Sequence, residues 1–313
     1  ANSSRFTISS DEITSKESGV KIFFDNDSIY HSNLKFKYSN NNRELQLYRD
    51  AVGLSGAKML NTYHQLTMDF ELFKWDIDSD SITFGSIPGT GESRLTFESV
   101  SMYDSTRFDE LRGIDKVHPL MLIKRYAKAS KKNVFYVNDF ARFTGFPTYQ
   151  IKPYLIRIAS QGFIYYNSIE DKVTIQPMLY NYIKAASGIG DYDVISFPSH
   201  VKGSRNEPIV NAILDISTKE LTILGIKDVL LSHKRKVWVI PNNQQIIVNQ
   251  NRDFTFDGYI ILGDGRMQLD VRNTSFYYDK FKLDLNNIES LALAVPTNPR
   301  RKDQNNLDIL TRV

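Results

Sequence analysis

The chain contains no cysteine, and this absence removes several kinds of site at once. Without thiols it forms no disulfide, holds no thiolate metal centre and offers no cysteine nucleophile. Tryptophan is also scarce, with 2 residues among 313. Tyrosine and phenylalanine are abundant instead, at 17 and 19 residues, and both favour strands.

Long apolar runs are missing as well. No run approaches the roughly 20 residues that a membrane-spanning helix needs. The chain begins Ala1-Asn2-Ser3-Ser4, without an initiator methionine or an apolar leader. We therefore expect a mature product or a piece excised from a longer protein, with no membrane span in this chain.

The motifs of common enzyme classes are absent too. The five histidines are isolated from one another, so none suggests a metal site. Asp76, Asp78 and Asp80 have the spacing of a calcium loop, but Ser81 and Ile87 stand where that loop needs Gly and Glu. We expect no enzyme and assign no catalytic, cofactor-binding or metal residue. A carboxylate pair that meets only on folding would leave open a polysaccharide-binding or -cleaving β-helix.

Most of the chain has the sequence pattern of β-strands. Residues 6–97 and 194–295 alternate apolar and polar side chains over short runs, which is typical of half-buried strands. Residues 76–84 and 215–223 both read strand, polar turn, strand, and residues 34–47 are a looser copy. The echo suggests stacked hairpins in a solenoid, roll or sandwich, although any β-hairpin has this general pattern.

The middle of the chain changes to helical spacing. His118-Pro119 begins a helix, residues 133–136 form a short strand, and Asn138 caps a second helix that ends at Gly145. A third helix ends at Gly162, a hairpin follows over residues 163–175, and Pro177 starts a last helix. This order, with FARFTGFP at 140–147 and ASQGFI at 159–164, resembles the winged helix-turn-helix family.

We therefore predict a mainly β protein with an inserted α+β module. The expected domains are a β-rich segment at 1–114, a winged-helix module at 115–188, a β-rich segment at 189–298 and a polar tail or linker at 299–313. The two β-rich segments could also pack together as one β domain.

The charge of the middle module favours nucleic acid as a partner. Residues 116–187 carry eleven Lys or Arg and three Asp or Glu, a net charge of +8 in a chain whose total is +3. If this reading holds, the phosphate contacts are Lys152, Arg157 and Lys172.

The third helix argues against base reading. With Ile151, Leu155 and Ile158 inward, helical geometry places Tyr149, Pro153 and Ile156 outward. Such a stripe lacks the hydrogen-bonding groups that read bases. Pro153 should also loosen the start of this helix. We expect the stripe to be covered by the flanking β segments or by a protein partner.

Six short stretches carry a second resemblance: RLTFES (94–99), GIDKVHPL (113–120), QGFIYY (161–166), DYDVI (191–195), NRDFTF (251–256) and FKLDL (281–285). They resemble an uncharacterised large β-rich protein family of Bacteroidota. The resemblance implies a structural or protein-interaction (scaffold) fragment of a larger cell-envelope protein, located in the periplasm or at the outer membrane. It implies no cofactor.

Overall fold

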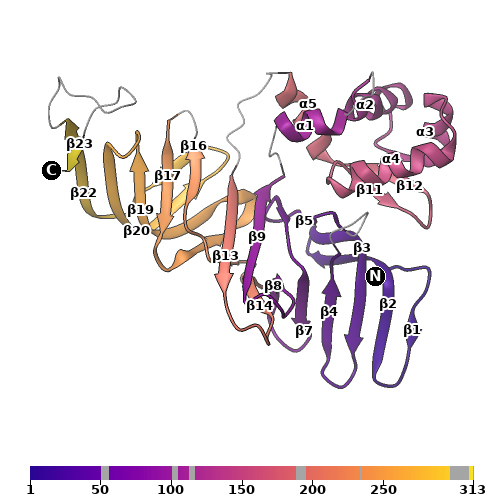
Figure 1. Ribbon diagram of the computed structural model, residues 1–313, viewed down its shortest axis with the longest axis horizontal. Coiled ribbons are helices and arrows are strands. Elements are labelled where there is room, and N and C mark those ends of the chain that lie inside the picture. The colour runs from indigo at the N-terminus through magenta and orange to yellow at the C-terminus, as the bar shows by residue number, and fades with distance from the viewer. Residues whose placement is uncertain are drawn as a thin grey trace.

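The computed structural model describes residues 1–50, 56–100, 105–112, 117–187, 195–232, 235–296 and 310–312. These residues form one connected sheet of 20 antiparallel strands and a smaller module of helices with its own three-stranded sheet (Figure 1). The expectation of a mainly β protein is confirmed. The domain boundaries expected at 114/115 and 188/189 lie outside the described residues, as does most of the tail.

The strands of the large sheet come from both halves of the chain. In the first half they are β1 (Thr7–Ile8), β2 (Glu12–Phe24), β3 (Asp27–Ser39), β4 (Glu44–Tyr48), β5 (Met59–Asn61), β6 (Leu66–Met68), β7 (Leu72–Asp76), β8 (Ser81–Ser86) and β9 (Glu92–Ser99). In the second half they are β13 (Ser196–Lys202), β14 (Ile209–Asp215), β15 (Leu221–Leu224), β16 (Val229–Ser232), β17 (Val237–Pro241), β18 (Gln245–Val248), β19 (Phe254–Leu262), β20 (Met267–Tyr277), β21 (Lys282–Asp284), β22 (Asn287–Pro296) and β23 (Leu310–Arg312).

The hairpins that echo one another in the sequence lie side by side. The β3–β4 hairpin pairs through β4 with β7, and the β7–β8 hairpin pairs through β8 with β14 of the β14–β15 hairpin. Cross-strand partners then line up in apolar rows, because a period of two places every second side chain on one face. One row consists of Phe36, Leu47, Phe73, Phe84, Ala212, Ile223 and Ile246.

The sheet folds into two layers that share the strands β3 and β19. One part of β3 pairs with β4 in the first layer, and Ile29 and Tyr30 of β3 pair with β5, which continues through β6, β9 and β13. At the other end, β19 pairs with both β18 and β17. One apolar core joins residues of both layers, including the fully buried Phe70, Phe97 and Phe197.

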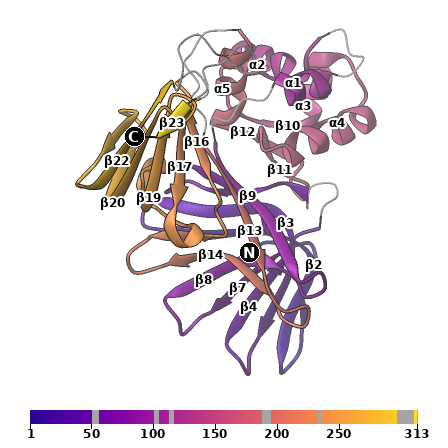
Figure 2. The same ribbon diagram turned by 60° about the vertical axis from the view of Figure 1, so that its left-hand side comes forward.

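The two β-rich segments are thus joined by strand pairing. β8 pairs with β14, and β9 pairs with β13 along seven residue pairs. The β9–β13 pair ends where Ser99 donates its N–H to the Ile195 carbonyl at 3.0 Å. The chain leaves the sheet towards the helices after this point and returns beside it (Figures 1 and 2).

The helical module, which we define as residues 117–187, has a separate core. It contains α2 (Pro119–Ser130), β10 (Val134–Tyr136), α3 (Val137–Thr144), α4 (Thr148–Ser160), β11 (Ile164–Asn167), β12 (Lys172–Ile175) and α5 (Pro177–Ala186), and α1 (Ser105–Arg112) precedes it. The strand order of its sheet is β10-β12-β11. Its core includes Leu120, Phe140, Leu155, Phe163 and Tyr182.

Helix signals in the sequence were mostly right in this module. His118 caps α2 by accepting the Leu120 N–H on Nδ1, with Pro119 in the first turn. Gly145 ends α3 in the left-handed conformation, at φ 76°. Two expectations were wrong. Asn138 does not cap α3, since the cap position is Tyr136, and Asn138 instead accepts a hydrogen bond from Thr148.

The helix α4 also differs from the expectation at Pro153. The sequence predicted a loosened start, but α4 is continuous from Thr148 to Ser160. Pro153 lies inside the helix, where it removes the N–H that would bond the Tyr149 carbonyl, and buried Ile151, Leu155 and Ile158 hold both sides of it against the module core. Packing therefore outweighs the local preference of proline here.

Candidate functional site

The stripe predicted on the third helix is not covered by the flanking β segments. Tyr149 is 73% exposed, Pro153 is exposed and Ile156 is half-buried. The helical argument for an outward direction is correct for Tyr149 and Pro153, whereas Ile156 packs partly against the module core. The expected cover from the flanking β segments is wrong for Tyr149 and Pro153. The physical reason is placement, because α3 and the neighbouring α4 lie on the side of the module away from the C-terminal half of the sheet (Figure 1).

Two further aromatic residues extend this surface. Phe143 lies in the last turn of α3 and is 45% exposed, and Phe146 in the turn to α4 is 53% exposed. The ring of Phe143 packs edge-on against Tyr126 of α2, with ring centroids 5.1 Å apart. We call this surface the aromatic turn, and it consists of Phe143, Phe146 and Tyr149. In the sequence, Phe143 and Phe146 stood out only as part of the 140–147 stretch that resembles the winged helix, so this surface was missed.

The basic residues predicted to contact nucleic acid are engaged within the chain. Lys152 Nζ lies 2.8 Å from Asp171 Oδ2, and Lys172 Nζ lies 3.7 Å from Glu170 Oε2. Arg157 donates to the Leu111 carbonyl at 3.2 Å. Burial raises the pKa of Asp171, but hydrogen bonds from Lys152 and Tyr166 outweigh it and hold the pKa below its usual range. Asp171 is therefore ionised at neutral pH and neutralises Lys152.

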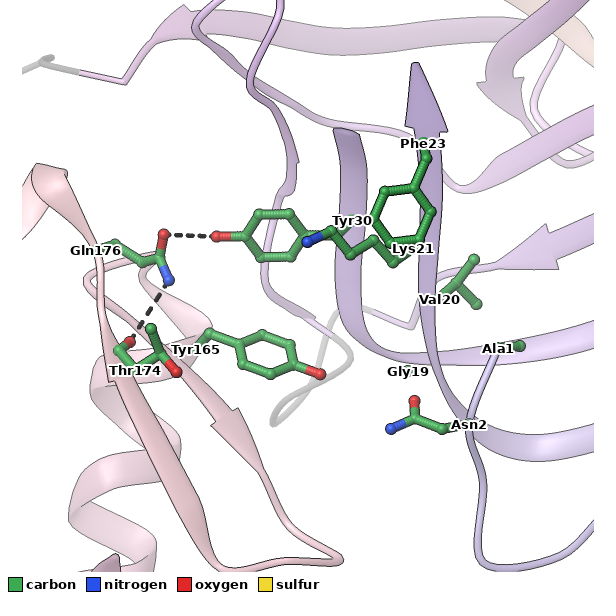
Figure 3. Close-up of a pocket in the computed structure, with 10 residues that line it drawn as sticks. All are labelled: Ala1, Asn2, Gly19, Val20, Lys21, Phe23, Tyr30, Tyr165, Thr174 and Gln176. Atoms are coloured by element: carbon green, nitrogen blue, oxygen red, sulfur yellow. Dashed lines mark hydrogen bonds between the residues drawn. The ribbon is translucent and has the colours of Figure 1, made fainter. Parts of the chain in front are cut away.

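A cleft separates the helical module from the large sheet. Figure 3 shows its lining, in which Lys21 and Phe23 of β2 and Tyr30 of β3 face Tyr165 of β11 and Gln176 at the start of α5. The cavity has a volume of about 490 Å³. A second cavity of about 200 Å³ lies beyond Tyr30 and is lined by residues such as His31, Lys58 and Met178.

Tyr30 lines both cavities, together with Tyr165 and Gln176, and contacts the module. Its hydroxyl donates to Gln176 Oε1 at 2.5 Å, and its ring packs edge-on against Tyr165 at 5.6 Å between centroids. Gln176 Nε2 donates in turn to the Thr174 carbonyl at 3.5 Å. Burial raises the pKa of Tyr30 above its ordinary value, so this hydroxyl stays protonated and remains a donor at physiological pH.

The described lining of the first cleft combines aromatic rings, amides, hydroxyl groups and the Lys21 ammonium, with no carboxylate or histidine among these residues. Such groups can bind a ligand, and the carboxylate pair that glycoside cleavage requires is not found in this part of the lining. His31 lines the second cavity, but burial lowers its pKa to about 4, and its Nε2 lies 2.7 Å from the Ala57 carbonyl. Its Nδ1 accepts the Asn33 N–H, so the ring is neutral and structural.

Neither a metal-binding cluster nor a membrane-spanning helix is found among the described residues. Among the residues that the structure describes, no three His, Asp or Glu side chains gather where they could hold a metal ion. Asp78, from the calcium-like spacing, pairs with Arg43, and Asp76 Oδ1 accepts the Asp78 N–H in the turn. Over the same residues, none of the helices has the length and apolar character needed to cross a bilayer.

Comparison with protein-family models, with curated proteins and with solved structures gives no match for this chain. The assignment of function therefore rests on the surfaces described above.

Proposed function

We propose that this chain is a non-enzymatic interaction scaffold, in which the β sheet carries the helical module and the module binds a protein. The observation that carries the proposal is the aromatic turn, whose three rings are 45–73% exposed in a short stretch of chain. Aromatic side chains are enriched at the centres of protein interfaces, where they bury a large area at little conformational cost. The partner surface should be apolar where it seats Phe146 and Tyr149.

We further propose that the module is a winged helix-turn-helix. In support, α2, β10, α3, α4 and the β11–β12 hairpin follow one another in the order of that fold, and β10 pairs with the outer side of the hairpin. The hairpin would be the wing and α4 the helix that reads DNA in nucleic-acid-binding members. Here the exposed side of α4 starts with Tyr149 and Pro153, and Lys152 is neutralised by the wing residue Asp171. Protein contact suits this face better than base reading.

The cell-envelope location is also a proposal, and it is supported by the resemblance to the large β-rich family of Bacteroidota. A scaffold fits that location, since a long two-layered sheet can hold a module at a fixed place in a larger assembly. Fractionation of source cells, with an antibody against this chain, tests the location. Recovery in the cytoplasmic fraction would contradict it.

Site-specific photo-crosslinking in source cells tests the interaction proposal. A photoreactive phenylalanine analogue at position 149 should give an adduct with one defined protein. The same analogue at Ile169, which is 57% exposed in the β11–β12 turn, serves as the control for chance collisions. Phe146→Ser should abolish the adduct at 149 while the circular dichroism spectrum stays unchanged, and the purified partner should bind the parent chain and not this variant. Identical adducts at 149 and 169 would refute the proposal.

A further inference from the structure

A row of cations lies along the outer side of α2 and continues past its end. It consists of Lys124, Arg125, Lys128, Lys131 and Lys132, and we call it the α2 cation row. Arg125, Lys128, Lys131 and Lys132 are exposed, and Lys124 is half-buried. With 100° per residue, Lys124, Arg125 and Lys128 fall within about 100° of one another around the helix, so they share one side.

The charges of the module explain why this row matters. The helical module has three acidic residues, Asp139, Glu170 and Asp171. Each is already engaged by a cation outside the row, namely Arg142, Lys172 and Lys152. Within the described residues, no ion pair reaches the α2 cation row. The described residues therefore leave its positive charge uncompensated.

Helix electrostatics account for only part of the row. Cations in the last turn of a helix stabilise its negative end, which suits Lys128 and Lys131. Lys124 and Arg125 lie in the middle of α2, where that effect has faded. Five neighbouring like charges repel one another unless an anion lies opposite them. The positive charge that these five residues place on one side of the module therefore favours binding of an anionic ligand.

We infer that the α2 cation row binds the phosphate backbone of double-stranded nucleic acid without reading its sequence. The inference goes beyond the protein-contact function, because it uses α2 and not the aromatic turn. A polyanion with regularly spaced charges complements a linear row of cations better than a single phosphate does. The described exposed face of α2 carries no large apolar side chain to insert among lipids, which argues against a membrane surface.

Fluorescence anisotropy with a labelled DNA duplex of arbitrary sequence tests this inference. Binding should weaken with salt, and three or four phosphate contacts predict a slope of about −3 to −4 in a plot of log affinity against log salt. The variant Lys124→Gln/Lys128→Gln/Lys131→Gln should flatten that slope by about 2–3. A second duplex of unrelated sequence should bind equally well.

A matched variant separates a site from mere net charge. Lys202→Gln/Lys227→Gln/Lys280→Gln removes the same charge from exposed positions on the large sheet and should leave the slope unchanged. Equal effects of the two triple variants, or no salt-dependent binding by the parent chain, would overturn the inference. So would binding to anionic phospholipid vesicles without binding to duplex. Phe146→Ser leaves duplex binding intact if the inference holds, so the outcome is independent of the protein-contact proposal.

Discussion

The hydroxyl of Tyr30 on β3 lies 2.5 Å from Oε1 of Gln176, which stands at the N-cap of α5. This hydrogen bond joins the large sheet to the helical module between residues 146 positions apart in the chain. The strands that precede and follow the module in the chain, β9 and β13, also pair with each other, so the module is attached to the sheet at two neighbouring points. The Tyr30–Gln176 hydrogen bond therefore fixes the orientation of the module relative to the large sheet.

Loss of this bond should loosen the module without unfolding either part. In Tyr30→Phe the Tyr165 ring contact persists, and one hydrogen bond of about 1 kcal/mol is lost. We expect a wider distribution of distances between spin labels on β12 and β4, measured by pulsed electron paramagnetic resonance. Tyr165→Phe removes a hydroxyl from the same cleft and should leave the distribution narrow. Equal distributions in the parent and Tyr30→Phe would show that the bond does not hold the module.

Two buried histidines should make the sheet sensitive to mild acid. Burial lowers the pKa of His31 and of His64 to about 4, against an ordinary value of 6.5. The unfolded chain therefore binds more protons than the folded one between pH 6.5 and 4, and the free energy of unfolding falls as pH falls through this range. The full loss is about 3 kcal/mol for each histidine, most of it developed by pH 4.

Urea unfolding between pH 7 and 5 checks this dependence. His31→Gln and His64→Gln should each lower stability at pH 7 yet flatten the pH dependence. The double variant His31→Gln/His64→Gln should lose most of the pH dependence over this range. A slope that is the same in these variants as in the parent chain would contradict the assignment to His31 and His64.

Because the large sheet and the helical module have separate apolar cores, we expect a core mutation in one part to destabilise mainly that part. Phe140 is fully buried in the module beside Tyr126 and Phe135, whereas Phe84 is fully buried in the sheet beside Phe70 and Phe73. Either Phe→Ala change should cost about 3–5 kcal/mol. Native-state hydrogen exchange should accelerate in α2–α5 for Phe140→Ala and in β7, β8 and β14 for Phe84→Ala. Acceleration throughout the molecule in both variants would mean that the two parts unfold together.

Local signals in the sequence located the elements well. His118-Pro119, Gly145 and Pro177 mark helix ends through backbone chemistry that depends on a few neighbouring residues. Alternation likewise predicted the hairpins, because strand period is a local property. The outward direction of Tyr149 followed from helix geometry alone.

The predictions that failed concern features that depend on residues far away in the sequence. Alternation says which face a residue occupies, not which strand lies beside it, so the pairing of Gly85 with Val210 could not be predicted. The cover expected for Tyr149 failed for the same reason, since it depended on where the module sits. The cleft at Tyr30 and Gln176 was missed because neither residue belongs to a motif. The exposure of Phe143 could have been suspected from its step of 300° after Phe140, which places it off the centre of the buried side of α3.

Substitution of Gly85 tests the pairing of β8 with β14, which joins the two halves of the chain. A Cβ at this position of β8 would stand 1.9 Å from the Ile209 carbonyl oxygen of β14, beside the irregularity between Val210 and Ala212. Gly85→Ala must therefore push the two strands apart, and we expect a loss of about 3 kcal/mol. Trp75 and Trp238, the two tryptophans of the chain, both lie in the large sheet and report its urea unfolding by fluorescence. Thr83→Ala on the same strand should cost less than about 1 kcal/mol. Equal midpoints for Gly85→Ala and Thr83→Ala would mean that β8 and β14 do not approach this closely.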